Sequence, residues 1–180
     1  SDSVLLTSRD GLTYQQTFRE ALIRPSLRLN EWVSRTGYPA LNVVQTGPEE
    51  MSLYVNQDYT QPTAHLRRYS MRLDGFASVN ASYEGGEMTT KPLLFKGNRL
   101  VLNVATSAAG SVRVEIQDGD GKPVSGYTAA ECVELLGNRL AMPVRWKQGN
   151  GLGALAGKPV RLRFVMKDAD LYALRFVGQN

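Results

Sequence analysis

The stretch Pro159-Val-Arg-Leu-Arg-Phe-Val-Met166 decides the fold that we predict for this 180-residue chain. Its apolar side chains Val160, Leu162 and Phe164 alternate with two arginines, so a β-strand would place them on one face and the arginines on the other. A strand with one apolar and one wet face is typical of an antiparallel sheet that packs on a second sheet.

The same alternation appears in three other segments of the C-terminal half, residues 99–105, 111–117 and 171–176. Turn-forming residues separate these segments at intervals of roughly ten residues, which indicates an all-β sandwich. We therefore predict an all-β chain in which residues 83–180 form an antiparallel, jelly-roll-like β-sandwich.

Two connections within this half are readable. Asp118-Gly-Asp-Gly-Lys-Pro123 has the residues of a tight hairpin turn. It begins like a helix–loop–helix calcium loop, but Ala129 stands where such a loop needs its final acid, so we expect no metal there. A Ca²⁺ site built from other loops stays open. Thr128-Ala-Ala-Glu131 has the pattern of a capping box, which predicts one or two helical turns over residues 132–136.

Residues 1–82 show strand–turn–strand units around Asp-Gly pairs instead. The pairs Asp10-Gly11 and Asp74-Gly75 recur after about 64 residues, and such a repeat is typical of β-propeller blades. Between them, residues 40–45 and 50–55 predict a further hairpin, with residues 67–72 as a third strand. We expect this region to consist of β-hairpins that resemble one and a half propeller blades. Two unrelated hairpins are the alternative.

The composition limits the classes of function. The net charge is only +4, and strand alternation would divide the densest basic group between two faces, so we expect no nucleic-acid binding. No apolar run approaches the roughly 18 residues of a membrane span, so we expect no membrane insertion.

One Cys and one His are too few for a Cys/His metal site, and we expect no metal and no cofactor. Cys132 is expected to be a buried thiol, and Trp146 a part of the sandwich core.

An ordered set of short motifs carries a family resemblance over nearly the whole chain. These motifs are Thr7-Ser-Arg-Asp-Gly11, Tyr38-Pro-Ala40, Glu50-Met-Ser-Leu-Tyr54, Arg68-Tyr-Ser-Met-Arg-Leu-Asp-Gly-Phe76, Thr90-Lys-Pro-Leu93, Val112-Arg-Val-Glu115, Val144-Arg-Trp146, Val160-Arg-Leu-Arg-Phe164 and Ala169-Asp-Leu-Tyr172. In this order they resemble the C-terminal end of bacterial glycoside hydrolase-like proteins, broadly those of families 32 and 43, in which a five-bladed propeller precedes a β-sandwich. The resemblance implies a carbohydrate context, an extracellular or periplasmic location, and catalytic acids contributed largely by earlier blades.

Candidate ligand-binding residues gather around the second predicted hairpin. Glu50 begins a strand and is the acid best placed to face a propeller's central funnel, but glycoside hydrolysis needs two carboxyl groups and spacing nominates no partner for it. The other acids, among them Asp58 and Glu115, are expected to be surface charges. Aromatic and polar side chains nearby can bind sugar by stacking and hydrogen bonding, although a polar loop with one packed tyrosine is the alternative. The candidate binding residues are Glu50, Tyr54, Tyr59, His65 and Arg67.

Three functional hypotheses follow. The first is a non-catalytic C-terminal region of a carbohydrate-active protein, in which the sandwich supports the last blade and the chain can also bind a poly- or oligosaccharide. The second is an interaction or oligomerisation module without sugar affinity. The third is part of a glycoside hydrolase, with Glu50 near the site and the other acids outside the chain. In each case the exposed strands of the N-terminal third are expected to pack on a second copy or on an upstream propeller domain.

Overall fold

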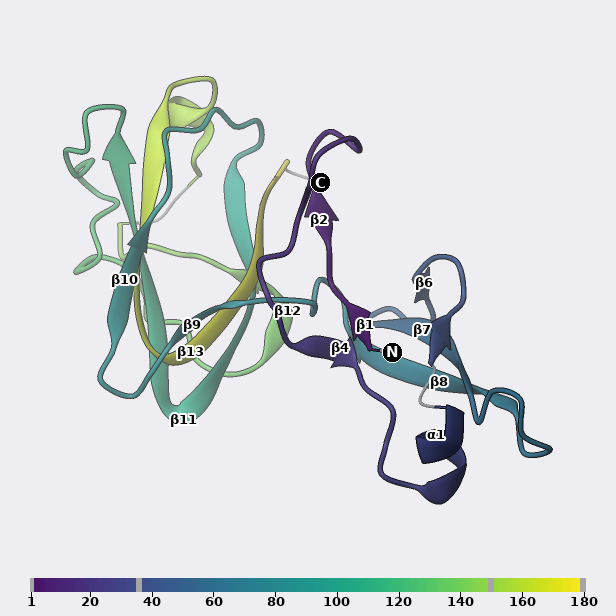
Figure 1. Cartoon of the computed structure of the whole chain (residues 1–180). Helices are drawn as coiled ribbons and strands as arrows, with labels where there is room; N and C mark the ends of the chain where they lie inside the picture. The colour runs from purple at the N-terminus through teal and green to yellow at the C-terminus, as the bar shows by residue number, and fades with distance from the viewer. Residues whose placement is uncertain (1, 35–36, 149–150, 179–180) are drawn as a thin grey trace. The chain divides into compact units, whose positions relative to one another are not determined.

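The computed structural model describes residues 2–34, 37–148 and 151–178, and nearly all of its regular structure is β (Figure 1). All its strand pairs are antiparallel, so the predicted all-β class is confirmed. The chain divides into two compact units, Ser1–Leu73 and Asp74–Asn180. Strand β9 (Val79–Ala81) pairs with β13 (Val160–Val177), so the sheet of the second unit begins before residue 83.

The second unit is built on one pair of long strands. β11 (Arg99–Asp118) pairs with β13 along nearly its whole length, and the register shifts between Thr106 and Ser111. Figure 1 shows both strands turning back in the middle, so that one half of the pair lies over the other half and makes the two layers of the sandwich. The four predicted strand segments are confirmed as strands, but they join into two continuous ones.

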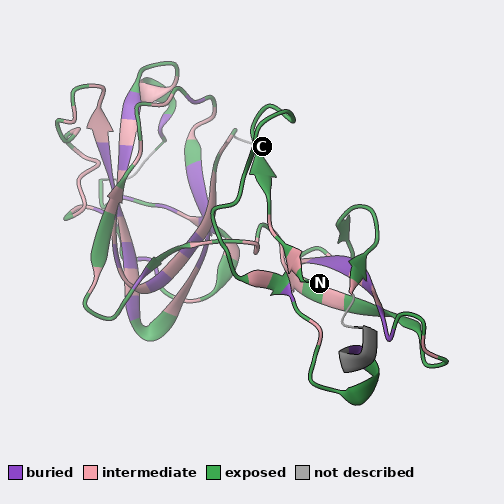
Figure 2. Ribbon diagram, in the orientation of Figure 1, coloured by how far each residue is buried: buried purple, intermediate pink, exposed green. Residues whose placement is uncertain are grey.

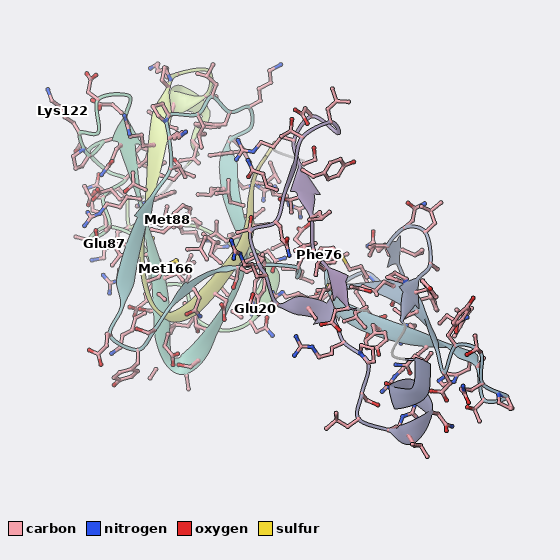
Figure 3. All side chains as sticks on the ribbon, viewed as in Figure 1. Glu20, Phe76, Glu87, Met88, Lys122 and Met166 are labelled. Carbon is pink, nitrogen blue, oxygen red and sulfur yellow. The ribbon has the colours of Figure 1, made fainter. Side chains whose placement is uncertain are left out.

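Shorter strands extend each layer. β9 and β12 (Arg139–Pro143) pair with the half that contains the start of β11 and the end of β13. β10 (Gly86–Thr89) pairs with the opposite half, where Figure 3 shows Met88 on the side of Met166 and Glu87 directed outward. One short 3₁₀ helix, η1 (Gly153–Leu155), lies in the connection that leads to β13.

The core lies between the two layers (Figure 2), as the alternating pattern predicted. The fully buried side chains come from both halves of the long pair and include Leu100, Leu102, Val104, Val112, Val114, Ile116, Leu162 and Phe164. Burial of a side chain of this size contributes about 1.5–3 kcal/mol, so this layer of contacts supplies most of the favourable free energy of the unit. Trp146 is buried as predicted, and its indole N–H donates a hydrogen bond to the carbonyl of Val114 at 3.0 Å.

The predictions for the two connections, residues 118–123 and 128–136, were confirmed to different extents. The turn after β11 is confirmed, because the carboxylate of Asp118 accepts hydrogen bonds from the backbone N–H groups of Asp120 and Lys122. The capping box also forms, with the Glu131 carboxylate bonded to the hydroxyl and N–H of Thr128. The helix predicted after it was wrong: the chain is extended there, and isolated bridges join Cys132 to Trp146 and Leu135 to Val112. Burial of Cys132 and Leu135 in the core explains why the helix does not continue.

The first unit contains small sheets. β7 (Glu50–Gln57) pairs with β5 (Tyr38–Pro39) and β6 (Val44–Gln45) on one edge and with β8 (His65–Arg72) on the other. This confirms the second predicted hairpin and its third strand. β1 (Ser3–Val4) pairs with β4 (Ala21–Ile23), β2 (Thr7–Ser8) pairs with β3 (Tyr14–Gln15), and α1 (Leu29–Ser34) is a short helix.

The two Asp-Gly turns are not equivalent. Asp10 lies in the β2–β3 hairpin, where its carboxylate accepts the N–H groups of Leu12 and Thr13 at 2.8 Å each. Asp74 follows β8, but β8 pairs with β7 while the next strand, β9, pairs with β13. The second turn therefore connects two different sheets, and the unit repeat expected from the sequence is not reproduced.

The bend in the long strand pair provides a test of the fold. A Cβ on Gly110 would lie 2.7 Å from the carbonyl oxygen of Lys167 and still closer to that of Asp168. We expect Gly110→Ala to lower the free energy of unfolding by about 2 kcal/mol or more, because only backbone could move to relieve the clash. Gly153→Ala is the matched control, since nothing lies within 4 Å of its Cβ position. Urea unfolding of both variants measures the difference, and equal stabilities would contradict the tight packing at the bend.

Candidate functional site

The candidate residues lie on β7, β8 and the loop between them, on two faces of the strand pair. The register places Glu50, Tyr54 and Arg68 on one face and His65 and Arg67 on the other. We call the first the polar face; with Glu50, Tyr54 and Arg68 it includes Ser52 and Ser70 of the two strands and Thr46 of the preceding turn. Of the five residues predicted to bind a ligand, the structure thus brings Glu50 and Tyr54 to the same face.

Tyr59 lies in the loop that joins the two strands. It is exposed, and its ring contacts that of Tyr38 edge to face with centroids 5.0 Å apart. On the face opposite the polar face, Arg67 lies over the ring of Tyr69 at 5.4 Å and donates to the side-chain oxygen of Gln57 at 3.3 Å. Through these contacts, the side chains of Tyr59 and Arg67 pack against other side chains of the same unit.

Glu50 is held as an ionised acceptor on the polar face. Its Oε1 accepts hydrogen bonds from the Thr46 hydroxyl at 2.8 Å and from the Arg68 guanidinium at 3.0 Å. The bond from Thr46 and the charge of Arg68 lower the pKa of Glu50 below its usual value in spite of some desolvation. Because a general acid needs a raised pKa near neutrality, this arrangement suits hydrogen bonding and not proton donation.

An ion cluster with two buried acids and a half-exposed arginine lies beside the opposite face. We call it the Arg28 cluster, and it consists of Arg28, Glu31 and Asp58. One guanidinium nitrogen of Arg28 lies 2.5 Å from Glu31 Oε1 and 3.3 Å from Asp58 Oδ1, and the two acids are 4% and 3% exposed. Asp58 also lies 3.9 Å from the ring of His65. The prediction that Asp58 is a surface charge was therefore wrong.

The Arg28 cluster is charge-compensated. Burial acts to raise the pKa of Glu31, but hydrogen bonds from Ser26 and Arg28 outweigh it and lower the pKa to about 2. The cavity beside Glu31 and Gln57 measures only about 10 Å³, room for roughly one water molecule. The cluster has no space for a substrate, and its geometry fits the support of the loops around β7.

The sandwich has a comparable ion network on its outer face. Arg163 bridges Glu87 at 2.7 Å and Glu115 at 3.2 Å, and Glu115 also accepts from Gln117 at 2.9 Å. The two carboxylates raise the pKa of Arg163, and Glu115 has a lowered pKa because these hydrogen bonds outweigh its burial. Glu115 is only 5% exposed, so the expectation of a surface charge was wrong here too. These charges fasten β10, β11 and β13 together.

Cys132 is enclosed in the sandwich core. It is 2% exposed, and its sulfur accepts a hydrogen bond from the N–H of Val114 at 3.3 Å. Burial raises the pKa of the Cys132 thiol, which disfavours the nucleophilic thiolate. The prediction of a buried thiol is confirmed.

Comparison with protein-family models, with curated proteins and with solved structures found no match to this chain. Within residues 2–34, 37–148 and 151–178, no group of three or more His, Cys, Asp or Glu side chains is arranged to hold a metal ion. None of the described helices is long and apolar enough to cross a membrane.

The Arg28 cluster makes the stability of the first unit depend on pH. Because the pKa of Glu31 is lowered in the folded state, its carboxylate stabilises the fold above about pH 4.5, and this contribution is lost as the pH falls toward 2. We expect Glu31→Gln to lower the free energy of unfolding at pH 7 by about 2 kcal/mol, a difference that shrinks across that pH range. Hydrogen exchange of the β7 amides measures it, with the exposed Glu20→Gln as control. A difference that is the same at pH 7 and pH 2 would contradict the ionic role.

The enclosure of Cys132 predicts a slow thiol. At pH 8 a thiol reagent should leave the native protein unlabelled and should modify one thiol per chain once guanidinium chloride unfolds the sandwich, since the sequence contains one cysteine. Mass spectrometry of the intact chain measures the labelling. Rapid modification of the native protein would show that the thiol is accessible.

Proposed function

We propose that the chain is a non-catalytic region of a carbohydrate-active protein, in which the sandwich is a structural support and the polar face of β7 and β8 binds glycan. The observation that carries this proposal is the position of Tyr54 directly across from Arg68, with Glu50 bonded to the same guanidinium. An aromatic ring can stack on the apolar face of a sugar, while a carboxylate and a guanidinium accept from and donate to its hydroxyl groups.

Accessibility favours this face. The side chains of Arg68 and Glu50 are 49% and 39% exposed, so a ligand can reach both. Their mutual hydrogen bond and the bond from Thr46 hold the two charged groups in place before a ligand arrives. Such preorganisation lowers the entropic cost of binding.

Two features support the non-catalytic part of the proposal. Glycoside hydrolysis uses a carboxylic acid and a second carboxylate on either side of the scissile bond. Glu50 has a lowered pKa, and two further carboxylates near the strand pair, Glu31 and Asp58, are buried against Arg28. The antiparallel succession of β6, β7 and β8 fits the first strands of a propeller blade, which supports the resemblance to the C-terminal end of glycoside hydrolase-like proteins.

An interaction module without sugar affinity is the second candidate. It is favoured by the number of exposed large apolar residues in the first unit, of which Leu12, Leu27 and Leu41 are 87%, 87% and 90% exposed. Where such side chains form a contiguous patch, they mark a contact site. A strict monomer in solution would count against this candidate.

Affinity electrophoresis in gels that contain soluble polysaccharides tests glycan binding. We expect at least one polysaccharide to retard the protein, and Tyr54→Ala to raise the dissociation constant about tenfold, because loss of an aromatic contact costs on the order of 1 kcal/mol or more. Tyr83→Ala, at an exposed tyrosine of the sandwich, is the matched control. No retardation by any polysaccharide would overturn the glycan-binding part of the proposal. Hydrolysis of chromogenic glycosides that is lost in Glu50→Gln would overturn the non-catalytic part.

A further inference from the structure

β8 has a partner strand on one side only. It pairs with β7 over all eight of its residues, and in the part of the chain that the structure describes no strand pairs with its other edge (Figure 1). Exposed edges are usually shortened, interrupted by proline or covered, because they can pair with another chain. β8 is eight residues long and contains no proline, and its protection is its positive charge, which leaves the edge available to an oppositely charged strand.

The hydrogen bonds around β7 show which backbone groups of β8 face this edge. The N–H of Leu73, one step beyond β8, donates to the carbonyl of Glu49, so residues at odd positions of β8 direct their backbone groups toward β7. The carbonyl of Glu50 instead accepts hydrogen bonds from the backbone N–H groups of Thr46 and Gly47, on the edge of β7 that faces away from β8. Backbone groups of successive residues thus alternate between the two edges of each strand. The N–H and C=O groups of residues 66, 68 and 70 therefore point outward.

The side chains around the edge define the partner. β8 contains three arginines and a histidine and no acid, so two copies of β8 side by side would place arginines on both neighbouring strands. Like charges on adjacent strands are destabilising, whereas opposite charges stabilise the pair. Leu66 is 66% exposed and offers an apolar contact at one end of the edge.

We propose that the outer edge of β8 binds an extended acidic segment of a partner protein by strand addition. Main-chain hydrogen bonds to Leu66, Arg68 and Ser70 hold the added strand, and carboxylates beside Arg67 and Arg68 select it. This surface shares Arg68 with the polar face, but it holds its partner through the backbone of the edge and not through the ring of Tyr54.

A synthetic ten-residue peptide that alternates threonine and valine around a central pair of glutamates tests the proposal. In the full chain, hydrogen exchange should be fast at the amides of Leu66, Arg68 and Ser70 and slow at those of Arg67 and Tyr69. The peptide should protect the first three directly and slow their exchange by a larger factor than that of the other two, which it slows only by stabilising the unit. A peptide with lysines in place of the glutamates should bind at least about tenfold more weakly, a loss that matches one or two charge pairs.

A variant that removes one backbone N–H distinguishes strand addition from binding of the peptide by electrostatic attraction alone. Proline is tolerated on an edge strand where its missing N–H would face solvent, so Ser70→Pro should retain the β7–β8 pairing and lose peptide binding. Ser70→Ala, which keeps the N–H, should bind as the wild type does. The inference is overturned if Ser70→Pro binds the peptide equally well, if the three outward amides are already protected in the free protein, or if the chain dimerises through β8.

Discussion

The antiparallel pairing of β11 with β13 is the interaction on which the rest of the sandwich depends. These two strands supply both layers, because the pair turns back on itself where Gly110 approaches the backbone of Lys167 and Asp168. The approach requires a residue without a side chain in β11, and Asp168 has φ = 41°, in the left-handed region that Asp tolerates better than most residues. Since most of the buried core residues of both layers lie on these strands, the bend brings the two apolar faces together and closes the core.

The first unit is stabilised in a different way. Among its side chains that the structure describes, the buried apolar ones are few, namely Ile23, Met51, Leu53 and Val55, and most of the large exposed apolar side chains belong to it. Two buried acids contribute to its interior, where the Arg28 cluster ties α1 to the loop after β7. Fewer buried apolar side chains give this unit less hydrophobic stabilisation than the sandwich has, at least among the residues that the structure describes.

The strands of the sandwich were predictable because period-two alternation is a local signal that burial reinforces. Their joining was not, since residues 107–110 have no register partners in β13, and β11 is continuous across them because the segments on both sides pair with the same long strand. The capping box was also correct locally, but core burial of Leu135 overrode the helix it predicted. The Arg28 cluster escaped prediction because Arg28 and Asp58 are separated by 30 positions and meet only when the loop after β7 adopts φ = 53° at Asp58. Alternation separates the two faces within each strand, but the β7–β8 register is needed to tell which residues of β8 share a face with Glu50 and Tyr54.

Ligand binding and stability are linked in the first unit. Both proposed binding surfaces, the polar face and the outer edge of β8, lie on the β7–β8 pair, where few of the described apolar side chains of the unit are buried. A ligand that binds only the folded form adds RT ln(1 + [L]/Kd) to the free energy of unfolding, about 2.7 kcal/mol at a hundredfold excess over Kd. That amount is a large fraction of the stability of a unit this size. Binding at either surface would therefore also stabilise the fold, whereas the sandwich, with its continuous apolar core, holds its shape without a ligand.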